Sequence, residues 1–103
     1  MFGILKNIFG NDAPIKEALT NGAVILDVRT PAEFRGGHVK GSINIPVTEI
    51  GRNIEKIKKY NKPVVACCAS GMRSGTAAGM LKQAGIEAYN GGPWTSVQQM
   101  MVQ

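Results

Sequence analysis

The two cysteines of the chain lie next to each other, where an apolar run gives way to a short turn. Residues 64–68 form the apolar run, and residues 69–74 lead into a segment rich in small residues. A thiol at a strand end, facing a helix N-terminus across a turn of backbone N–H groups, is placed to bind an anion and to ionise readily. This pattern predicts a reactive thiol whose chemistry involves an anionic species.

The position of the glycine in the turn favours one thiol over the other. Five residues separate Cys67 from Arg73, the spacing of cysteine-dependent phosphatases, whereas four separate Cys68 from Arg73. A loop that closes around an anion needs a residue free to adopt positive φ, and Gly71 stands three residues after Cys68. Adjacent strand side chains point to opposite faces, so Cys67 is expected to be a small core residue that cannot easily bond Cys68. We therefore assign Cys68 as the nucleophile.

The elements that must position this loop alternate between apolar runs and helical patterns. Four short strands are predicted, at residues 23–26, 42–45, 64–67 and 86–89, and residues 90–93 are expected to form a turn. Helical patterns are predicted to begin at Asp12, Thr30, Ile50, Ser74 and Trp94. Strands that alternate with helices over this length indicate an α/β fold with a small parallel sheet.

The start of the second predicted helix carries a strong local signal. Thr30 and Glu33 have the spacing of a capping box, with Pro31 at the first helical position. Asp27 and Cys68 both lie at predicted strand ends. Because ligands of parallel α/β sheets bind at the carboxyl ends of the strands, we expect both side chains at one functional edge.

Composition limits the remaining possibilities. The chain has 103 residues, 44% of them hydrophobic, so one domain with its own core is expected without disulfides. Free thiols fit a reducing compartment, which predicts a cytoplasmic location, and no apolar run approaches the length of a membrane span. The net charge of +5 favours anionic partners without selecting among them. We find no metal-ligand spacing and no dinucleotide fingerprint, so no cofactor is expected.

Three further features have simple interpretations. Residues 1–11 carry apolar residues at helical spacing and are expected to form an N-terminal flap or amphipathic segment before a domain at residues 12–103. Trp94 is interpreted as core or pocket wall, and no nucleic-acid partner is expected. The lysine cluster is interpreted as a solvated helix end, with a docking patch for an acidic protein as the alternative; it comprises Lys56, Lys58, Lys59 and Lys62.

Together these motifs resemble one family. Residues 68–74 look like the active-site loop of the rhodanese (sulfurtransferase) family, and residues 26–29, 33–34, 37–46 and 91–94 resemble its other motifs in family order. The likeness covers roughly residues 12–98. It implies a rhodanese-like α/β fold with a parallel sheet of about five strands flanked by helices. It also implies an activity that moves sulfane sulfur through a cysteine persulfide.

The resemblance assigns roles to individual residues. Cys68 would attack thiosulfate or a persulfide donor, and a small thiol, a thioredoxin-like protein or cyanide would accept the sulfur. Arg73 would order the loop and Ser74 would cap the following helix and donate toward the sulfur. Substrate-binding positions are Ala69, Ser70, Gly71, Met72, Arg73 and Ser74, and supporting positions are Asp27, Arg29, Glu33 and Arg35. His38 is most simply a turn residue.

The loop also departs from the family pattern. Ala69 stands where a basic residue often follows the catalytic cysteine, and Met72 adds no charge. The pocket is therefore expected to be less cationic, which leaves a persulfide as an alternative to thiosulfate as donor. Two other functions stay open: a non-catalytic module that carries or binds sulfur, and a phosphatase or arsenate reductase that uses the same anion-binding loop.

Overall fold

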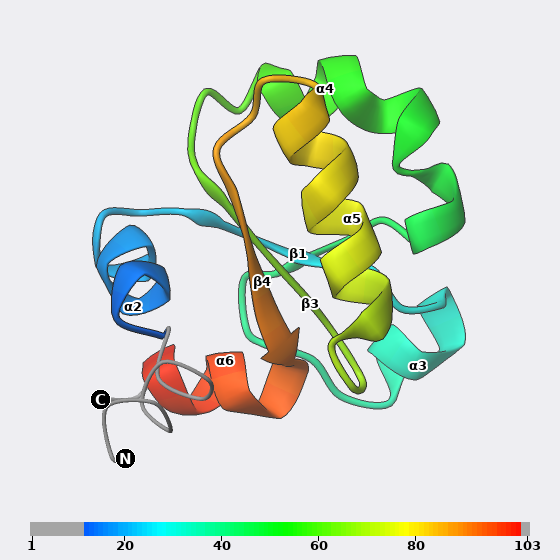
Figure 1. Ribbon diagram of the computed structural model, residues 1–103. Coiled ribbons are helices and arrows are strands. Elements are labelled where there is room, and N and C mark those ends of the chain that lie inside the picture. The colour runs from blue at the N-terminus through cyan, green and yellow to red at the C-terminus, as the bar shows by residue number, and fades with distance from the viewer. Residues whose placement is uncertain (1–11, 102–103) are drawn as a thin grey trace, which may run out of the picture.

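A computed structural model describes residues 12–101 as three layers, with one parallel sheet between two layers of helices (Figure 1). The sheet contains β1 (Val24–Asp27), β2 (Ile43–Asn44), β3 (Val64–Cys68) and β4 (Ala88–Pro93), in the order β2-β1-β3-β4. Across this part of the chain the sheet has four strands, fewer than the expected five or so. The prediction for residues 1–11 lies outside the described residues.

Helices cover both faces of the sheet. α2 (Asp12–Thr20) and α6 (Trp94–Met101) lie on one face, and α4 (Ile54–Lys58) and α5 (Met72–Gln83) lie on the other. α3 (Pro31–Arg35) lies beside the carboxyl ends of the strands (Figure 1). Two short 3-10 turns, η1 (Val47–Glu49) and η2 (Gly51–Asn53), lead into α4.

Side-chain alternation along β3 divides the core into two clusters. Ala66 and Cys68 pack with the residues under α5, whereas Val65 and Cys67 pack with those under α2 and α6. Every residue of β3 is buried, as the uninterrupted apolar run predicts for a central parallel strand. Cys67 and Cys68 are free thiols on opposite faces, which confirms the expectation that they do not bond each other.

The helix expected from Ile50 onward is interrupted. Residues 47–53 form η1 and η2, and regular helix begins only at Ile54. Asn53 donates its side-chain amide to the carbonyl of Glu49 at 2.8 Å and has a backbone φ of −110°. Asparagine amides compete for backbone carbonyls in this way, which explains the irregular start.

The turn expected at residues 90–93 is instead the end of β4. Its pairing with β3 shifts, so that Ala66 lies opposite Asn90 but Cys68 lies opposite Pro93. Gly91 makes this close approach possible, because a Cβ there would come within 2.7 Å of a Val97 methyl group. A sequence rich in glycine therefore continues the strand, since only glycine fits between the sheet and α6.

The strand order determines where the chain leaves the sheet in opposite directions. The chain leaves the carboxyl end of β1 toward β2 on one side, and leaves β3 toward β4 on the other. The carboxyl ends of β1 and β3 therefore form a topological switch point, where open α/β sheets bind ligands. Asp27 and Cys67 pair across these two strands, which puts the residues that follow them at this switch point.

Candidate active site

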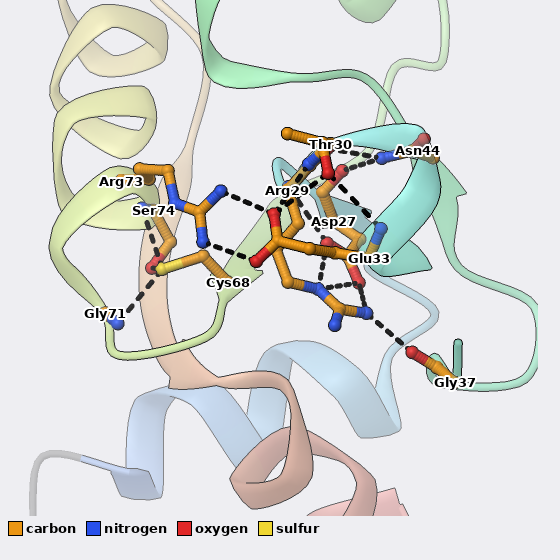
Figure 2. A network of polar contacts seen from close by, with 10 residues as sticks. All are labelled: Asp27, Arg29, Thr30, Glu33, Gly37, Asn44, Cys68, Gly71, Arg73 and Ser74. Carbon is orange, nitrogen blue, oxygen red and sulfur yellow. Dashed lines mark hydrogen bonds and ion pairs between the residues drawn. The ribbon is translucent and has the colours of Figure 1, made fainter. Parts of the chain in front are cut away.

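The loop after β3 wraps around the sulfur of Cys68. Cys68 is the last residue of β3, and α5 begins at Met72 rather than at the expected Ser74. The Sγ atom accepts from the N–H of Gly71 at 3.0 Å and the N–H of Ser74 at 3.4 Å, and lies 3.3 Å from the Ser74 hydroxyl (Figure 2). The sulfur therefore occupies the place of a capping side chain at the N-terminus of α5.

Gly71 supplies the backbone geometry that this loop needs. It adopts a φ of +102° at the N-cap of α5 and has no side chain of its own to cap the helix. A Cβ at Gly71 would also lie 3.4 Å from the Cα of Gly92. The sequence correctly singled out the glycine. Ser74 does not cap α5 as expected but lies buried in its first turn, with its hydroxyl 3.3 Å from the Cys68 sulfur.

The surroundings of the Cys68 thiol favour its ionised form. Burial, the largest single influence, raises its pKa. The Ser74 hydroxyl, which can donate to a thiolate, and the backbone N–H groups of Ser74, Gly71 and Ser70 act in the opposite direction. The net effect is a pKa below the ordinary value of 9.0. Hydrogen bonds that stabilise a thiolate make the sulfur a better nucleophile at neutral pH.

Cys67 has the opposite environment on the other face of β3. Burial and the nearby Asp27 carboxylate raise the pKa of its thiol to about 12. A thiol with this pKa stays protonated and unreactive in the folded protein. The structure therefore separates the two neighbouring cysteines chemically.

A buried ion pair lies at the carboxyl end of β1. Arg29 donates to the Asp27 carboxylate at 2.8–3.1 Å, and also to the carbonyl of Gly37 at 2.7 Å. These hydrogen bonds to Asp27 raise the pKa of Arg29, whose guanidinium lies 5.0 Å from the centre of the Trp94 ring. Asn44 donates to the carbonyls of Asp27 and Arg29 and so fixes the strand end. Each charge of the pair is thus balanced by the other.

A second ion pair joins α3 to α5 at the rim. Arg73 donates to both carboxylate oxygens of Glu33, at 2.8 and 3.0 Å (Figure 2). Glu33 also accepts from the N–H and hydroxyl of Thr30, which completes the predicted capping box. The hydrogen bond from Arg73, followed by those from Thr30, lowers the pKa of Glu33 to about 2. Arg73 thus binds a side chain of α3, and not the loop carbonyls that the resemblance implied.

The remaining candidate residues lie at the surface of the loop or beyond it. Ala69 and Ser70 are exposed, and the Met72 side chain is 80% exposed. Arg35 is exposed at the end of α3, and the polar contacts found within residues 12–101 do not connect it to the Cys68 loop. His38 stacks on Phe34 and bonds its carbonyl through Nδ1, in line with a turn residue.

Sequence reasoning missed Asn90. Its amide donates to the carbonyl of Gly71 at 3.0 Å, and its oxygen accepts from the Ser74 hydroxyl at 2.7 Å and from the N–H of Gly92 at 2.9 Å. The one available signal was a polar residue beside a glycine pair, which is common in ordinary turns. Its reach to the Cys68 loop depends on how β4 pairs with β3.

Metal-binding clusters, membrane-spanning helices and grooves are the other features by which residues 12–101 could indicate a function. Within the described residues, no three His, Cys, Asp or Glu side chains gather where they could hold a metal ion. None of the helices between residues 12 and 101 combines the length and apolar character needed to cross a bilayer. A groove of about 440 Å³ lies at the opposite end of the sheet, and no predicted site residue lines it.

Comparison with known proteins agrees with this geometry. A family model described as "Rhodanese-like domain" matches residues 12–93. Uncharacterized protein YqhL of Bacillus subtilis is 42% identical over 69 residues, covering 66% of this chain and 54% of YqhL. Thiosulfate sulfurtransferase PspE of Escherichia coli is 36% identical over 61 residues, covering 58% of this chain and 59% of PspE. The chain thus spans little more than half the length of these relatives.

The fold comparison gives the same result. A solved Escherichia coli structure described as "rhodanese with anions" superimposes with a TM-score of 0.66 at 31% identity. The superposition covers 73% of this chain and 91% of that chain. The arrangement of the sheet and helices is therefore shared with this solved structure.

Proposed function

The chain belongs to the rhodanese-like domain family, and from this premise we propose that it is a sulfurtransferase that carries sulfane sulfur as a persulfide on Cys68. The observation that carries the proposal is the position of the Cys68 sulfur. It lies at the N-terminus of α5 within reach of two backbone N–H groups and the Ser74 hydroxyl. Such a site stabilises an anionic sulfur, which is the form that both attacks a donor and persists as a persulfide.

The first step loads the sulfur. The Cys68 thiolate attacks the outer sulfur of a donor, a new S–S bond forms, and the bond between that sulfur and the rest of the donor breaks with its electron pair. With thiosulfate the leaving group is sulfite, and with a persulfide it is a thiolate. The electron pair of Cys68 forms the new bond, and the electron pair of the broken bond leaves with sulfite or the thiolate. The outer sulfur keeps the negative charge that it had in the donor, so no general base is needed once the thiol is ionised.

The second step delivers the sulfur. An acceptor thiolate, or cyanide, attacks the outer sulfur of the persulfide, and the Cys68 thiolate leaves with the electrons of the broken S–S bond. A small thiol or a thioredoxin-like protein is the acceptor we propose. The same N–H groups hold the thiolate before loading and after delivery, and this is consistent with a cycle that needs no other cofactor.

The charges around the loop favour a donor of low charge. Arg73 is the one cation within residues 69–74, and the bidentate contact with Glu33 neutralises it. Ala69, Ser70 and Met72 add no charge at the exposed surface of the loop. We therefore propose a persulfide, with a single negative charge, as the physiological donor in preference to the thiosulfate dianion.

The ion pair between Arg73 and Glu33 also argues against phosphate chemistry. A cysteine-dependent phosphatase needs a cation on the phosphoryl oxygens to balance their charge. In this protein the Arg73 guanidinium already uses two donors on Glu33. The arrangement is better suited to a sulfur atom that bears one negative charge.

A non-catalytic sulfur carrier is the second candidate function. Cys68 has no exposed surface, because its own sulfur occupies the position in which the loop N–H groups converge. A donor therefore reaches the Cys68 sulfur only when the atoms that cover it move aside. A carrier that is loaded and unloaded by docked proteins would tolerate this closed loop better than an enzyme that turns over small molecules.

Mass spectrometry of the intact protein tests the proposal. After incubation with thiosulfate, or with the persulfide of 2-mercaptoethanol, we expect a mass increase of one sulfur atom that cyanide removes as thiocyanate. The increase is expected to be lost in Cys68→Ser and kept in the matched control Cys67→Ser. Loading without turnover would favour the carrier, and loading of Cys68→Ser would overturn the assignment.

The two free thiols also bear on location. Cys67 and Cys68 are both free in the structure. Persulfide chemistry requires a thiol that is not consumed by disulfide formation, so we propose a reducing compartment, the cytoplasm.

A further inference from the structure

Asn90 lies beside the Cys68 loop with its amide in a fixed orientation. The carbonyl of Gly71 can only accept, so it must face the Asn90 NH2 group at 3.0 Å. The N–H of Gly92 can only donate, so it must face the Asn90 oxygen at 2.9 Å. These two contacts leave the Asn90 oxygen, and not its nitrogen, 2.7 Å from the Ser74 hydroxyl.

This orientation determines where the Ser74 proton lies. An amide oxygen has no proton to give, so Ser74 must donate its single hydroxyl proton to Asn90. The Ser74 oxygen then presents lone pairs to the sulfur of Cys68, 3.3 Å away, and the Cys68 S–H must be the donor between them. The hydrogen bonds of the structure are therefore those of the protonated thiol.

Ionisation of Cys68 removes the donor from the contact with Ser74. A thiolate facing the Ser74 lone pairs is repelled, whereas a thiolate facing the Ser74 proton gains a charge-assisted hydrogen bond. The hydroxyl must therefore turn from Asn90 to the sulfur, while the S–H proton leaves to solvent. Asn90 keeps the Gly92 N–H as a partner during this change.

We propose that Asn90 is a positioning residue that holds the Ser74 hydroxyl in competition with the sulfur of Cys68 and so makes the sulfur less ready to become an anion. The inference rests on the proposed function, because it concerns the same sulfur. Removing the Asn90 side chain is expected to release the Ser74 proton to the thiolate. Replacing Asn90 by aspartate is expected to hold that proton more strongly and to add a negative charge nearby.

The surrounding structure leaves room for Asn90 and also holds the start of α5 by another contact. A Cβ on Gly75 would lie 3.2 Å from the Asn90 amide nitrogen, so the glycine leaves room for this side chain. The Gly71 carbonyl also accepts from the N–H of Gly75 at 3.0 Å, which holds the start of α5 without Asn90. Asn90 itself is exposed, so water can replace its contacts.

Other charged groups around the sulfur are shared by all the variants compared. Arg73 on α5 is paired with Glu33 on α3, and Asp27 is paired with Arg29 at the end of β1. Cys67 on β3 stays protonated, with a pKa of about 12. A difference between Asn90 variants therefore reports on Asn90 and Ser74.

The test measures the rate of Cys68 alkylation by iodoacetamide as a function of pH in the full chain. We expect the pH at which this rate is half-maximal, its midpoint, to fall by about half to one pH unit in Asn90→Ala and to rise by at least as much in Asn90→Asp. A shift of this size corresponds to the free energy of one hydrogen bond. Asn21→Asp makes the same charge change at an exposed position before β1, at the opposite edge of the sheet, and is expected to leave the midpoint unchanged.

Repeating the Asn90 substitution in a protein that already carries Ser74→Ala separates positioning by Asn90 from a general loss of structure. In Ser74→Ala the Asn90→Ala substitution is expected to have no effect on the midpoint, because no hydroxyl remains to be released. Midpoints that move in the same direction in Asn90→Ala and Asn90→Asp, or an Asn90→Ala shift that persists without Ser74, would overturn the inference. Because alkylation requires no sulfur transfer, failure to load sulfur in the intact-mass experiment would count against the proposed function alone.

Discussion

At the scale of single residues, two adjacent cysteines of one strand differ because they point into different environments. Cys68 points toward α5, where N–H groups converge on its sulfur and lower its pKa. Cys67 points toward α2 and α6, where burial raises the pKa of its thiol to about 12. The alternation of side chains along a strand therefore places one thiol where its ionised form is favoured and the other in the core, although both are the same residue type.

The raised pKa of Cys67 predicts a loss of stability at alkaline pH. Above 9.0, the ordinary value, an unfolded chain releases the Cys67 proton while the folded protein retains it, so the free energy of unfolding falls toward pH 12. The largest slope from this group is about 1.4 kcal/mol per pH unit. Urea unfolding of wild type and Cys67→Ala between pH 9 and pH 10.5 measures this slope of the free energy of unfolding against pH.

The comparison isolates Cys67 because the other titrating groups are common to both proteins. Cys67→Ala is expected to lose less stability per pH unit than wild type, whatever the difference between them at pH 7. Cys68, with its lowered pKa, contributes in the opposite direction and only below 9.0. Equal slopes in the two proteins would show that Cys67 ionises normally in the folded state.

At the scale of elements, the site is a junction of two helix N-termini. The Thr30 capping box begins α3, and the Cys68 sulfur takes the capping position of α5. Glu33 joins the two, because the carboxylate that completes the box also binds Arg73. The short α3 is thereby fixed to the loop after β3, and the rim of the site is held without a net charge.

Glu33→Gln is predicted to change the preference for donors. Glutamine can keep the capping box, but it leaves the Arg73 guanidinium without a neutralising charge. We expect kcat/KM for thiosulfate to rise about three- to tenfold relative to the persulfide of 2-mercaptoethanol, because a dianion gains more from the freed cation than a monoanion. The rise should shrink as ionic strength increases.

A matched variant controls for net charge. Glu17→Gln makes the same change on an exposed position of α2, on the other side of the sheet from α5, and is expected to leave the donor ratio unchanged. Equal losses with both donors in Glu33→Gln would mean that Glu33 only orders the loop, and the proposed role in donor choice would then be wrong.

At the scale of the whole molecule, the close fit between layers positions the site. β4 passes between β3 and α6 only because Gly91 has no side chain. The shifted pairing that follows brings Asn90 and Gly92 against the Cys68 loop. The functional edge therefore depends on packing on the far face of the sheet as well as on the loop itself.

Two glycine substitutions test this packing by having opposite effects. Gly91→Ala places a Cβ 2.7 Å from Val97 and 2.8 Å from Val65, and is expected to destabilise the protein by about 1–3 kcal/mol. Gly79→Ala lies within α5 with no atom closer than 4 Å to the new Cβ, and is expected to stabilise it by about 0.5–1 kcal/mol. Urea unfolding at pH 7 measures both, and a neutral Gly91→Ala would refute the tight fit.

Much of the fold could be predicted from local sequence. The four strands, the α3 capping box and the placement of Asp27 and Cys68 at one edge follow from apolar runs and capping residues, and all are present. The errors lie where tertiary packing overrides local preference. Residues 90–93 have the composition of a turn but continue β4, and the helix expected from Ile50 is interrupted at Asn53.

For this protein, the sequence alone determined the family, the position of the loop after β3 and which thiol faces it, because motif spacing and strand alternation are local properties. Only the tertiary structure decided how the charges and protons of the site are shared. Arg73 meets Glu33 across 40 residues of chain, and Asn90 meets Ser74 across 16. Such contacts depend on how helices and strands pack together, and no local pattern of residues specifies them.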